Sequence, residues 1–218
     1  MEDVVIYGTG SPILVDIEES LRRSGIAIRA GVKNRDGDSF LSDGTLEIAP
    51  DTLDDAIRGL PFVVPLFTPA NRQTAAREAK ARGFSRPLAL IDATVAPPRD
   101  CRFGPGSYVN AGAVLGAASA FEAFVFINRG VGIGHHARFG PFVSIGPGVV
   151  IAGQVTIGKG AMIGAGAVVL PKITIGDNAV IGAGSVVTRD VPAHCLALGN
   201  PARIVKTGIA GYDGKTVD

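Results

Sequence analysis

Residues 145–169 read IGPGVV-IAGQVT-IGKGAM-IGAGAV-V, a series of six-residue units that each open with a large apolar residue. The same frame runs without a break from Ile91 to Val187, and sixteen of its seventeen opening positions are large and apolar, Pro97 being the exception. A small or branched residue stands four positions after each opening residue, and glycine directly follows the opening residue in nine units. This periodicity decides the fold of the second half of the chain.

A period of six fits neither an α-helix, which repeats every 3.6 residues, nor a strand with two alternating faces. It is typical of a solenoid whose coil has three flat faces, with one unit on each face. The large residue fills the core, the small residue avoids crowding it, and glycine adopts corner conformations that a β-carbon would penalise. Three units make a coil, and coils stack about 4.8 Å apart. We therefore predict that residues 89–206 form an all-β left-handed parallel β-helix of nearly six coils.

Residues 1–88 lack the repeat and show the pattern of a small α/β Rossmann-like domain, and residues 207–218 form a C-terminal tail. Buried apolar runs and helix-boundary residues alternate as in a β–α–β unit. The predicted elements are a strand at 4–7, a helix from 12 to about 24, strands at 26–32 and 62–67, and a helix from Thr68-Pro69 to Arg82 that Gly83 ends.

The turn after the first strand reads Gly8-Thr9-Gly10-Ser11-Pro12. A dinucleotide-binding fingerprint requires a third glycine, and Ile13 stands at that position. Two interpretations remain open: the phosphate of a nucleotide seated at the N-terminus of the following helix, or a plain tight turn.

Composition and charge exclude several classes of partner. Hydrophobic residues make up 46% of the chain, charged residues 19%, and the net charge is +1, so we expect neither nucleic acid nor a membrane surface as the main partner. No signal peptide or membrane-spanning run is visible, which predicts a soluble cytoplasmic protein. Cys101 and Cys195 stand in neither a metal nor a redox spacing, as expected of idle thiols in a reducing compartment.

A Rossmann-like domain followed by a hexapeptide β-helix resembles the bacterial sugar acetyltransferases of the sialic acid O-acetyltransferase (NeuD) family. That family includes the N-acetyltransferases that act on nucleotide-linked amino sugars in bacillosamine and perosamine synthesis. The stretches that carry the resemblance are Ile127-Asn128 through His135-His136, Phe139 to Ser144, Ala152-Gly153-Gln154-Val155, and the closing Gly199-Asn200-Pro201-Ala202-Arg203.

The resemblance implies an acetyl-CoA-dependent acyltransferase that works as a homotrimer, with acetyl-CoA in the groove between two subunits. It makes His135 the general base, and Asn128, His136 and Gly153 its companions at the catalytic site, with the Gly153 amide holding the thioester oxygen. It further implies that coenzyme A lies along Ser144, Gly153, Gly164, Gly182 and Arg203, and that the sugar-nucleotide acceptor contacts Gly8, Thr9, Gly10, Asn71 and Arg72.

The sequence departs from the family pattern in three places. The acid that follows the catalytic histidine is replaced by His136, a second family histidine falls on Ser144, and the glycine-rich loop of the first domain is shortened. His136 is therefore open to three interpretations: it tunes His135, binds substrate, or simply covers the surface. His135 itself is either the base or a surface histidine on a turn.

The chemistry supports the assignment of His135 independently. Acetyl transfer needs a group that takes a proton near neutral pH, and histidine titrates in that range. Gly153 follows His135 by one coil, so the two are predicted to stack about 5 Å apart, and Gln154 is predicted to stack over and orient His136. Lys172, Arg189, Arg203 and Lys206 are either ligands of the coenzyme phosphates or a solvated basic surface.

No metal is expected. The γ-class carbonic anhydrases share the β-helix and bind zinc through histidines, but such a site needs three converging ligands. His194 lies more than three coils from His135, and the consecutive His135 and His136 are expected to point in different directions. The sequence thus predicts transfer of acetyl from acetyl-CoA to an amine, or else a hydroxyl, of a nucleotide-linked sugar. The alternatives are a catalytically silent β-helix for assembly or binding, and a metal-dependent lyase.

Overall fold

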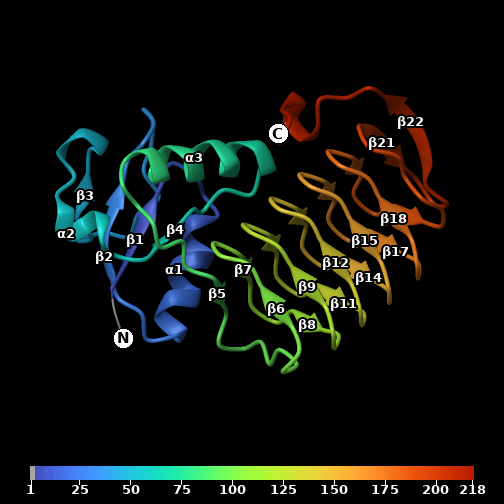
Figure 1. Cartoon of the computed structure of the whole chain (residues 1–218), viewed down its shortest axis with the longest axis horizontal. Coiled ribbons are helices and arrows are strands. Elements are labelled where there is room, and N and C mark those ends of the chain that lie inside the picture. The colour runs from blue at the N-terminus through green and yellow to red at the C-terminus, as the bar shows by residue number, and fades with distance from the viewer. Residues whose placement is uncertain (1–2) are drawn as a thin grey trace.

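The structure is a computed structural model that describes residues 3–218, so the first two residues of the predicted α/β domain lie outside it. Figure 1 shows an α/β unit at the N-terminal end of a stack of β-strands. The α/β unit holds a parallel sheet of order β3-β2-β1-β4. Its elements are β1 (Val4–Tyr7), α1 (Leu14–Arg23), β2 (Ile28–Val32), β3 (Glu47–Ile48), η1 (Pro50–Thr52), α2 (Asp55–Arg58), β4 (Phe62–Val63) and α3 (Pro69–Ala81).

The predicted elements of this unit are all present, β1 with the predicted bounds and the others with shorter ones. β1 is buried along its whole length, as its run of apolar residues requires. The strand predicted at 62–67 is only two residues long. Pro65, which has no N–H to give to a sheet, follows it closely. The sequence did not predict β3 or α2, because neither is long enough to show a period.

The second part is a β-helix whose strands fall on three parallel sheets. We call them the β10, β11 and β12 sheets after one member of each. From β5 to β20 the paired residues are one coil, 18 residues, apart, as Ile127 pairs with Ile145 and Ile145 with Ile163. The strands are β5 (Leu90–Ile91), β6 (Arg102–Phe103), β7 (Tyr108–Val109), β8 (Val114–Leu115), β9 (Ala120–Phe121), β10 (Phe126–Ile127), β11 (Gly132–Ile133), β12 (Arg138–Phe139), β13 (Ser144–Ile145), β14 (Val150–Ile151), β15 (Thr156–Ile157), β16 (Met162–Ile163), β17 (Val168–Val169), β18 (Thr174–Ile175), β19 (Val180–Ile181), β20 (Val186–Val187), β21 (Cys195–Leu198) and the antiparallel β22 (Arg203–Thr207).

The opening residues of the six-residue units fill the core, as the repeat predicted. Ile127, Ile145 and Ile163 are fully buried. On the β12 sheet the rings of Phe121 and Phe139 stack with centroids 4.8 Å apart. The period of the sequence therefore reports the stacking of the coils.

The glycines that directly follow the opening residues serve close packing between coils. An added β-carbon on Gly134 would lie 2.5 Å from the backbone nitrogen of Gly153, and one on Gly164 would lie 2.4 Å from that of Ala183. The positive backbone angles fall elsewhere at the corners, for example at Gly148 and Gly166. The sequence-based explanation by unusual backbone angles was therefore wrong for Gly134 and Gly164, where lack of space decides.

The α/β unit and the C-terminal tail both cover the outer face of the β10 sheet. Tyr108 and Phe126 on that face are buried in a cluster shared with β1 and α1. The tail contains η2 (Tyr212–Gly214) and returns to the coils, where Val217 exchanges two hydrogen bonds with the Asn178 side chain. It also reaches the α/β unit, beside which Figure 1 places the C-terminus, because the Gln73 side chain donates to the backbone oxygen of Asp218.

A buried ionic cluster joins α1 to the first coil. Asp92 is fully buried and accepts hydrogen bonds from Ser20 at 2.6 Å and from Arg23 at 2.7 Å. Burial acts to raise the pKa of Asp92, but hydrogen bonds from Arg23, Ser20 and Thr94 outweigh it and hold the pKa below its usual range. The cluster therefore stabilises the junction at neutral pH.

We expect Asp92→Asn to lower the free energy of unfolding by about 2 kcal/mol at pH 7. A carboxyl whose pKa is depressed in the folded state stabilises the fold above its unfolded pKa of about 4 and loses that contribution as the pH falls further. Urea unfolding of wild type and variant should therefore differ at pH 7, and the difference should shrink steadily as the pH falls below about 4, toward the still lower pKa of folded Asp92. A difference that stays constant as the pH falls from 7 to 2 would contradict an ionic role.

None of the helices within residues 3–218 combines the length and the hydrophobicity needed to cross a bilayer.

Candidate active site

His135 and His136 lie at the corner between the β11 and β12 sheets. Both follow the two-residue strand β11 and both are exposed. The left-handed backbone at His136, with φ of 57°, turns the chain toward β12. The repeat thus presents two imidazoles on an outer corner.

Gly153 lies directly against the His135 ring, one coil further along. An added β-carbon on Gly153 would be 2.8 Å from Nε2 of His135 and 3.0 Å from its Cε1. The predicted stacking of Gly153 on His135 is therefore confirmed. Gln154 uses its backbone here, since its N–H donates to the His135 carbonyl at 2.8 Å.

The two histidine rings meet each other, contrary to the expectation that they diverge. Nδ1 of His135 and Nδ1 of His136 are 2.9 Å apart, and the rings meet edge to face with centroids separated by 5.1 Å. The left-handed backbone of His136 accounts for the difference, because consecutive side chains of an ordinary strand point to opposite faces. One nitrogen of His135 thus faces His136, and the other faces Gly153.

Asn128, Gly164 and Gly182 occupy a different corner, between the β10 and β11 sheets, where they are spaced by whole coils. The Asn128 side chain is buried and accepts hydrogen bonds from the Arg129 backbone at 2.8 Å and from the Asn110 amide at 3.3 Å. One protomer therefore does not bring these three residues together with the pair of His135 and Gly153.

Ser144 and Arg72 were predicted as ligand contacts, and for their side chains the prediction is wrong. Both are buried where α3 packs on the β10 sheet. The Ser144 hydroxyl donates to the Phe67 carbonyl at 2.5 Å and accepts from the Arg72 guanidinium at 3.0 Å. Neither polar group reaches the surface, because the α/β unit covers this face. Arg203, on β22, is exposed.

The Arg72 guanidinium joins the α/β unit to the coils through hydrogen bonds to both. It donates at 2.6–3.0 Å to the carbonyls of Leu66, Phe67, Phe124, Phe142 and Val143. Burial lowers the pKa of Arg72 to about 9, so the group stays charged at neutral pH. The carbonyl oxygens supply the partial negative charge that this buried cation requires.

A cavity of about 500 Å³ opens at the carboxyl ends of β1 and β2, the edge at which open α/β sheets bind ligands. The predicted acceptor contacts Gly8, Gly10 and Asn71 all line it. Gly8 has a φ of 100°, which favours glycine. The prediction is wrong for the Thr9 side chain, which is fully buried and donates to Glu47 at 3.1 Å.

The sequence did not identify two further groups in this cavity. Arg35, just beyond β2, is ion-paired with Glu78 of α3. Its place after a predicted strand was a usable signal. Lys215 comes from the C-terminal tail and donates to the Asn71 side-chain oxygen at 2.9 Å. No sequence pattern predicted that Lys215 lines this cavity, because only folding brings the tail to this edge of the sheet.

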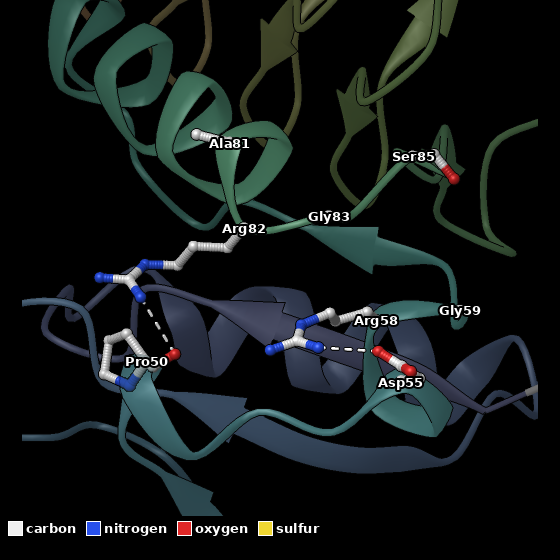
Figure 2. A pocket seen from close by; sticks show the side chains of 8 residues that line it. All are labelled: Pro50, Asp55, Arg58, Gly59, Ala81, Arg82, Gly83 and Ser85. Atoms are coloured by element: carbon white, nitrogen blue, oxygen red, sulfur yellow. Dashed lines mark hydrogen bonds and ion pairs between the residues drawn. The ribbon is translucent and has the colours of Figure 1, made fainter.

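Figure 2 shows a larger cavity, of about 730 Å³, between α2, the end of α3 and Pro50, which follows β3. Its two arginines are already paired: Arg58 with Asp55 at 2.7 Å, and Arg82 with the Pro50 carbonyl at 3.1 Å. None of the predicted acceptor contacts lines this cavity, so we do not take it as the acceptor site. Across residues 3–218, no three His, Cys, Asp or Glu side chains converge as ligands of a metal ion would.

Comparison with known proteins supplies a family. The family model "bacterial transferase hexapeptide (six repeats)" matches residues 154–189. No match was found among curated proteins. PerB from Caulobacter crescentus, solved with CoA and GDP-perosamine, is 33% identical, with 94% of this chain and 98% of PerB covered and a TM-score of 0.83.

Two further solved structures resemble this chain over nearly its whole length. A histidine-to-asparagine mutant of perosamine N-acetyltransferase from Caulobacter crescentus, solved with CoA and GDP-perosamine, is 32% identical to this chain. The match covers 94% of this chain and 98% of the mutant, with a TM-score of 0.84. The acetyltransferase domain of PglB from Neisseria gonorrhoeae, solved with acetyl coenzyme A, is 26% identical. The match covers 94% of this chain and 99% of that domain, with a TM-score of 0.83. The chain belongs to the same family as perosamine N-acetyltransferase, the sugar acetyltransferases built on hexapeptide repeats.

Proposed function

We propose that this protein transfers acetyl from acetyl-CoA to the amine of a nucleotide-linked sugar, with His135 as general base. The observation that carries the proposal is the contact between Gly153 and Nε2 of His135 on an exposed corner. A thioester carbonyl seated there lies beside both a proton acceptor and a backbone amide. PerB, which shares the fold from end to end, was solved with CoA and GDP-perosamine.

The chemistry proceeds by acyl transfer. The sugar amine attacks the thioester carbon while Nε2 of His135 takes a proton from the amine nitrogen. The Gly153 amide stabilises the oxyanion of the tetrahedral intermediate. The intermediate collapses to an amide, the carbon–sulfur bond breaks, and the departing coenzyme thiolate takes the proton back from His135.

The acceptor is assigned to the cavity of the α/β unit. Gly8 and Gly10 let a ligand approach the backbone closely, and the Lys215 ammonium offers a positive charge to a diphosphate. The GDP-perosamine bound by PerB belongs to the same chemical class. We assign residues 1–88 to acceptor binding, 89–206 to acetyl transfer and 207–218 to the tail, in a cytoplasmic protein.

A homotrimer is part of the proposal, and the three outer faces of the coils support it. The α/β unit and the tail cover the β10 sheet, and Arg102, Arg138 and Thr156 make the β12 sheet polar. The β11 sheet presents an uncovered apolar face, on which Val114 is 71% and Val150 49% exposed. Packing this face against a neighbour brings the corner of His135 toward the neighbour's corner of Asn128, Gly164 and Gly182, and three copies close a ring.

We expect Val150→Arg to break the trimer into monomers, because a buried unpaired guanidinium opposes packing of the β11 sheet. Light scattering would measure the mass. Thr156→Arg, on the β12 sheet, is the matched control and should stay trimeric. A Val150→Arg variant that keeps three times the chain mass would place the interface elsewhere.

We expect Gly153→Ala to lower kcat by about 10- to 100-fold, because the added methyl would sit 2.8 Å from Nε2 of His135 and push the ring out of place. Steady-state kinetics would measure the loss. The thermal midpoint should stay close to wild type, since the ring moves into solvent. Unchanged kcat would mean that the acetyl group does not pass between these two residues.

The direct test of the function is thiol release from acetyl-CoA in the presence of nucleotide-linked 4-amino sugars. Their 4-hydroxy counterparts test the less favoured O-acetylation. Turnover with one amine identifies the acceptor. Acetyl-CoA binding without turnover on any sugar would favour a silent scaffold, and zinc in the purified protein together with lyase activity would favour the metal enzyme.

A further inference from the structure

The two Nδ1 atoms of His135 and His136 lie at a hydrogen-bonding distance of 2.9 Å. A neutral imidazole has one N–H and one lone pair, so a hydrogen bond between two Nδ1 atoms requires that one carries a proton and the other does not. The contact therefore couples the tautomers of the two rings. Which ring donates decides which nitrogen of His135 can act as a base.

We propose that His136 is a positioning residue whose Nδ1 accepts the Nδ1–H of His135, which holds the His135 lone pair on Nε2, beside Gly153. In the opposite arrangement Nε2 of His135 carries a hydrogen and cannot take a proton from an amine. When Nε2 takes that proton, the His135 imidazolium keeps its hydrogen bond to a neutral His136. No proton moves to His136 during the cycle. The proposal rests on the proposed function of His135.

The surroundings of the pair favour a single shared proton. Ala117 and Ala118 stack on one side of the two histidines and Gly153 and Gln154 on the other, so the two adjacent coils place no carboxylate there to compete for the Nδ1–H. In the column of corner residues that contains His136, Asp100 lies two coils away on one side and Lys172 two coils away on the other. Arg138, two residues along the chain, donates to the Ala118 carbonyl.

A protonated His136 has N–H at both ring nitrogens and no longer accepts from His135. We therefore expect activity to require a neutral His136.

The backbone at position 136 allows three informative variants. Its φ of 57° lies in the left-handed region, which aspartate and asparagine tolerate. Alanine is already accommodated one coil below, where Ala118 has a φ of 59°. His136→Asn keeps a neutral acceptor, His136→Asp adds a charged acceptor, and His136→Ala removes the acceptor.

The first measurement is the tautomer of His135, read from the ring nitrogen shifts in ¹⁵N NMR at pH 8. The chain has only three histidines, so the spectrum can be assigned from single variants. We expect protonated Nδ1 and unprotonated Nε2 in wild type, His136→Asn and His136→Asp, and a proton on Nε2 in His136→Ala. A proton on Nε2 of wild-type His135 would overturn the proposal, whether or not any acceptor is turned over.

The second measurement is kinetic. We expect His136→Ala to lower kcat about tenfold without changing KM for acetyl-CoA, and His136→Asn to recover most of the loss, because a positioning role needs the acceptor rather than the ring. In His136→Asp the carboxylate stabilises the imidazolium, so the acid limb of kcat/KM should move up by about one pH unit. Unchanged kcat in His136→Ala together with an unmoved acid limb in His136→Asp would overturn the proposal.

Discussion

Replacing His135 with alanine should lower kcat/KM for acetyl transfer by about two to four orders of magnitude, the usual contribution of a positioned general base. The variant should fold normally, because the imidazole is exposed and fills no part of the core. Its affinity for acetyl-CoA should change little, since the ring contributes to the proton transfer. Thiol release would measure turnover and calorimetry the affinity.

His194→Ala is the matched control for this experiment. His194 lies near the end of the coils, where its Nδ1 is 3.0 Å from the Ile209 carbonyl. Its loss should leave turnover unchanged. Equal effects of the two substitutions would remove the special role of His135, and turnover that survives His135→Ala would move the base to another group.

Replacing Arg72 with methionine should lower the free energy of unfolding by about 3–5 kcal/mol. The guanidinium is buried, serves five carbonyl oxygens and the Ser144 hydroxyl, and lies 5.6 Å from the Phe126 ring centroid. Methionine keeps much of the volume but removes all of these donors. Only the Phe67 and Val143 carbonyls keep another one, from the Ser144 hydroxyl and the Phe126 backbone. Each buried acceptor left unsatisfied carries a cost. Urea unfolding would measure the loss.

Arg77→Met is the control, because Arg77 lies on the same helix but is exposed and paired only with Asp218. Exposed pairs contribute at most about 1 kcal/mol. Arg72→Lys should recover little, since an ammonium cannot present the planar fork of donors. If Arg72→Met lowers the free energy of unfolding no more than Arg77→Met does, the buried hydrogen bonds of Arg72 add nothing to stability.

The two halves of the chain differed in how far their sequence predicted their structure. Every six-residue unit of the β-helix places its opening residue in the same kind of core position. The frame from Ile91 to Val187 therefore specified the coils, their core and their register. The 18-residue length of a coil likewise predicted that Gly153 stacks on His135. Only the first-coil unit of Pro97 lacks a strand, as expected of a residue without a backbone donor. In the α/β unit the long elements were predictable and the short β3 and α2 were not.

The sequence by itself thus determined the solenoid, the family and the corner that carries His135, because these depend on local periodicity and on motifs within one coil. Only the tertiary structure decided which polar residues stay accessible. Arg72, Ser144 and Thr9 had suitable chemistry for ligands, but packing of the α/β unit buries their side chains. Folding also carried Lys215 from the tail to the acceptor cavity and turned His136 onto His135. Such contacts depend on where distant segments meet and on one backbone angle, and no pattern in the sequence encodes either.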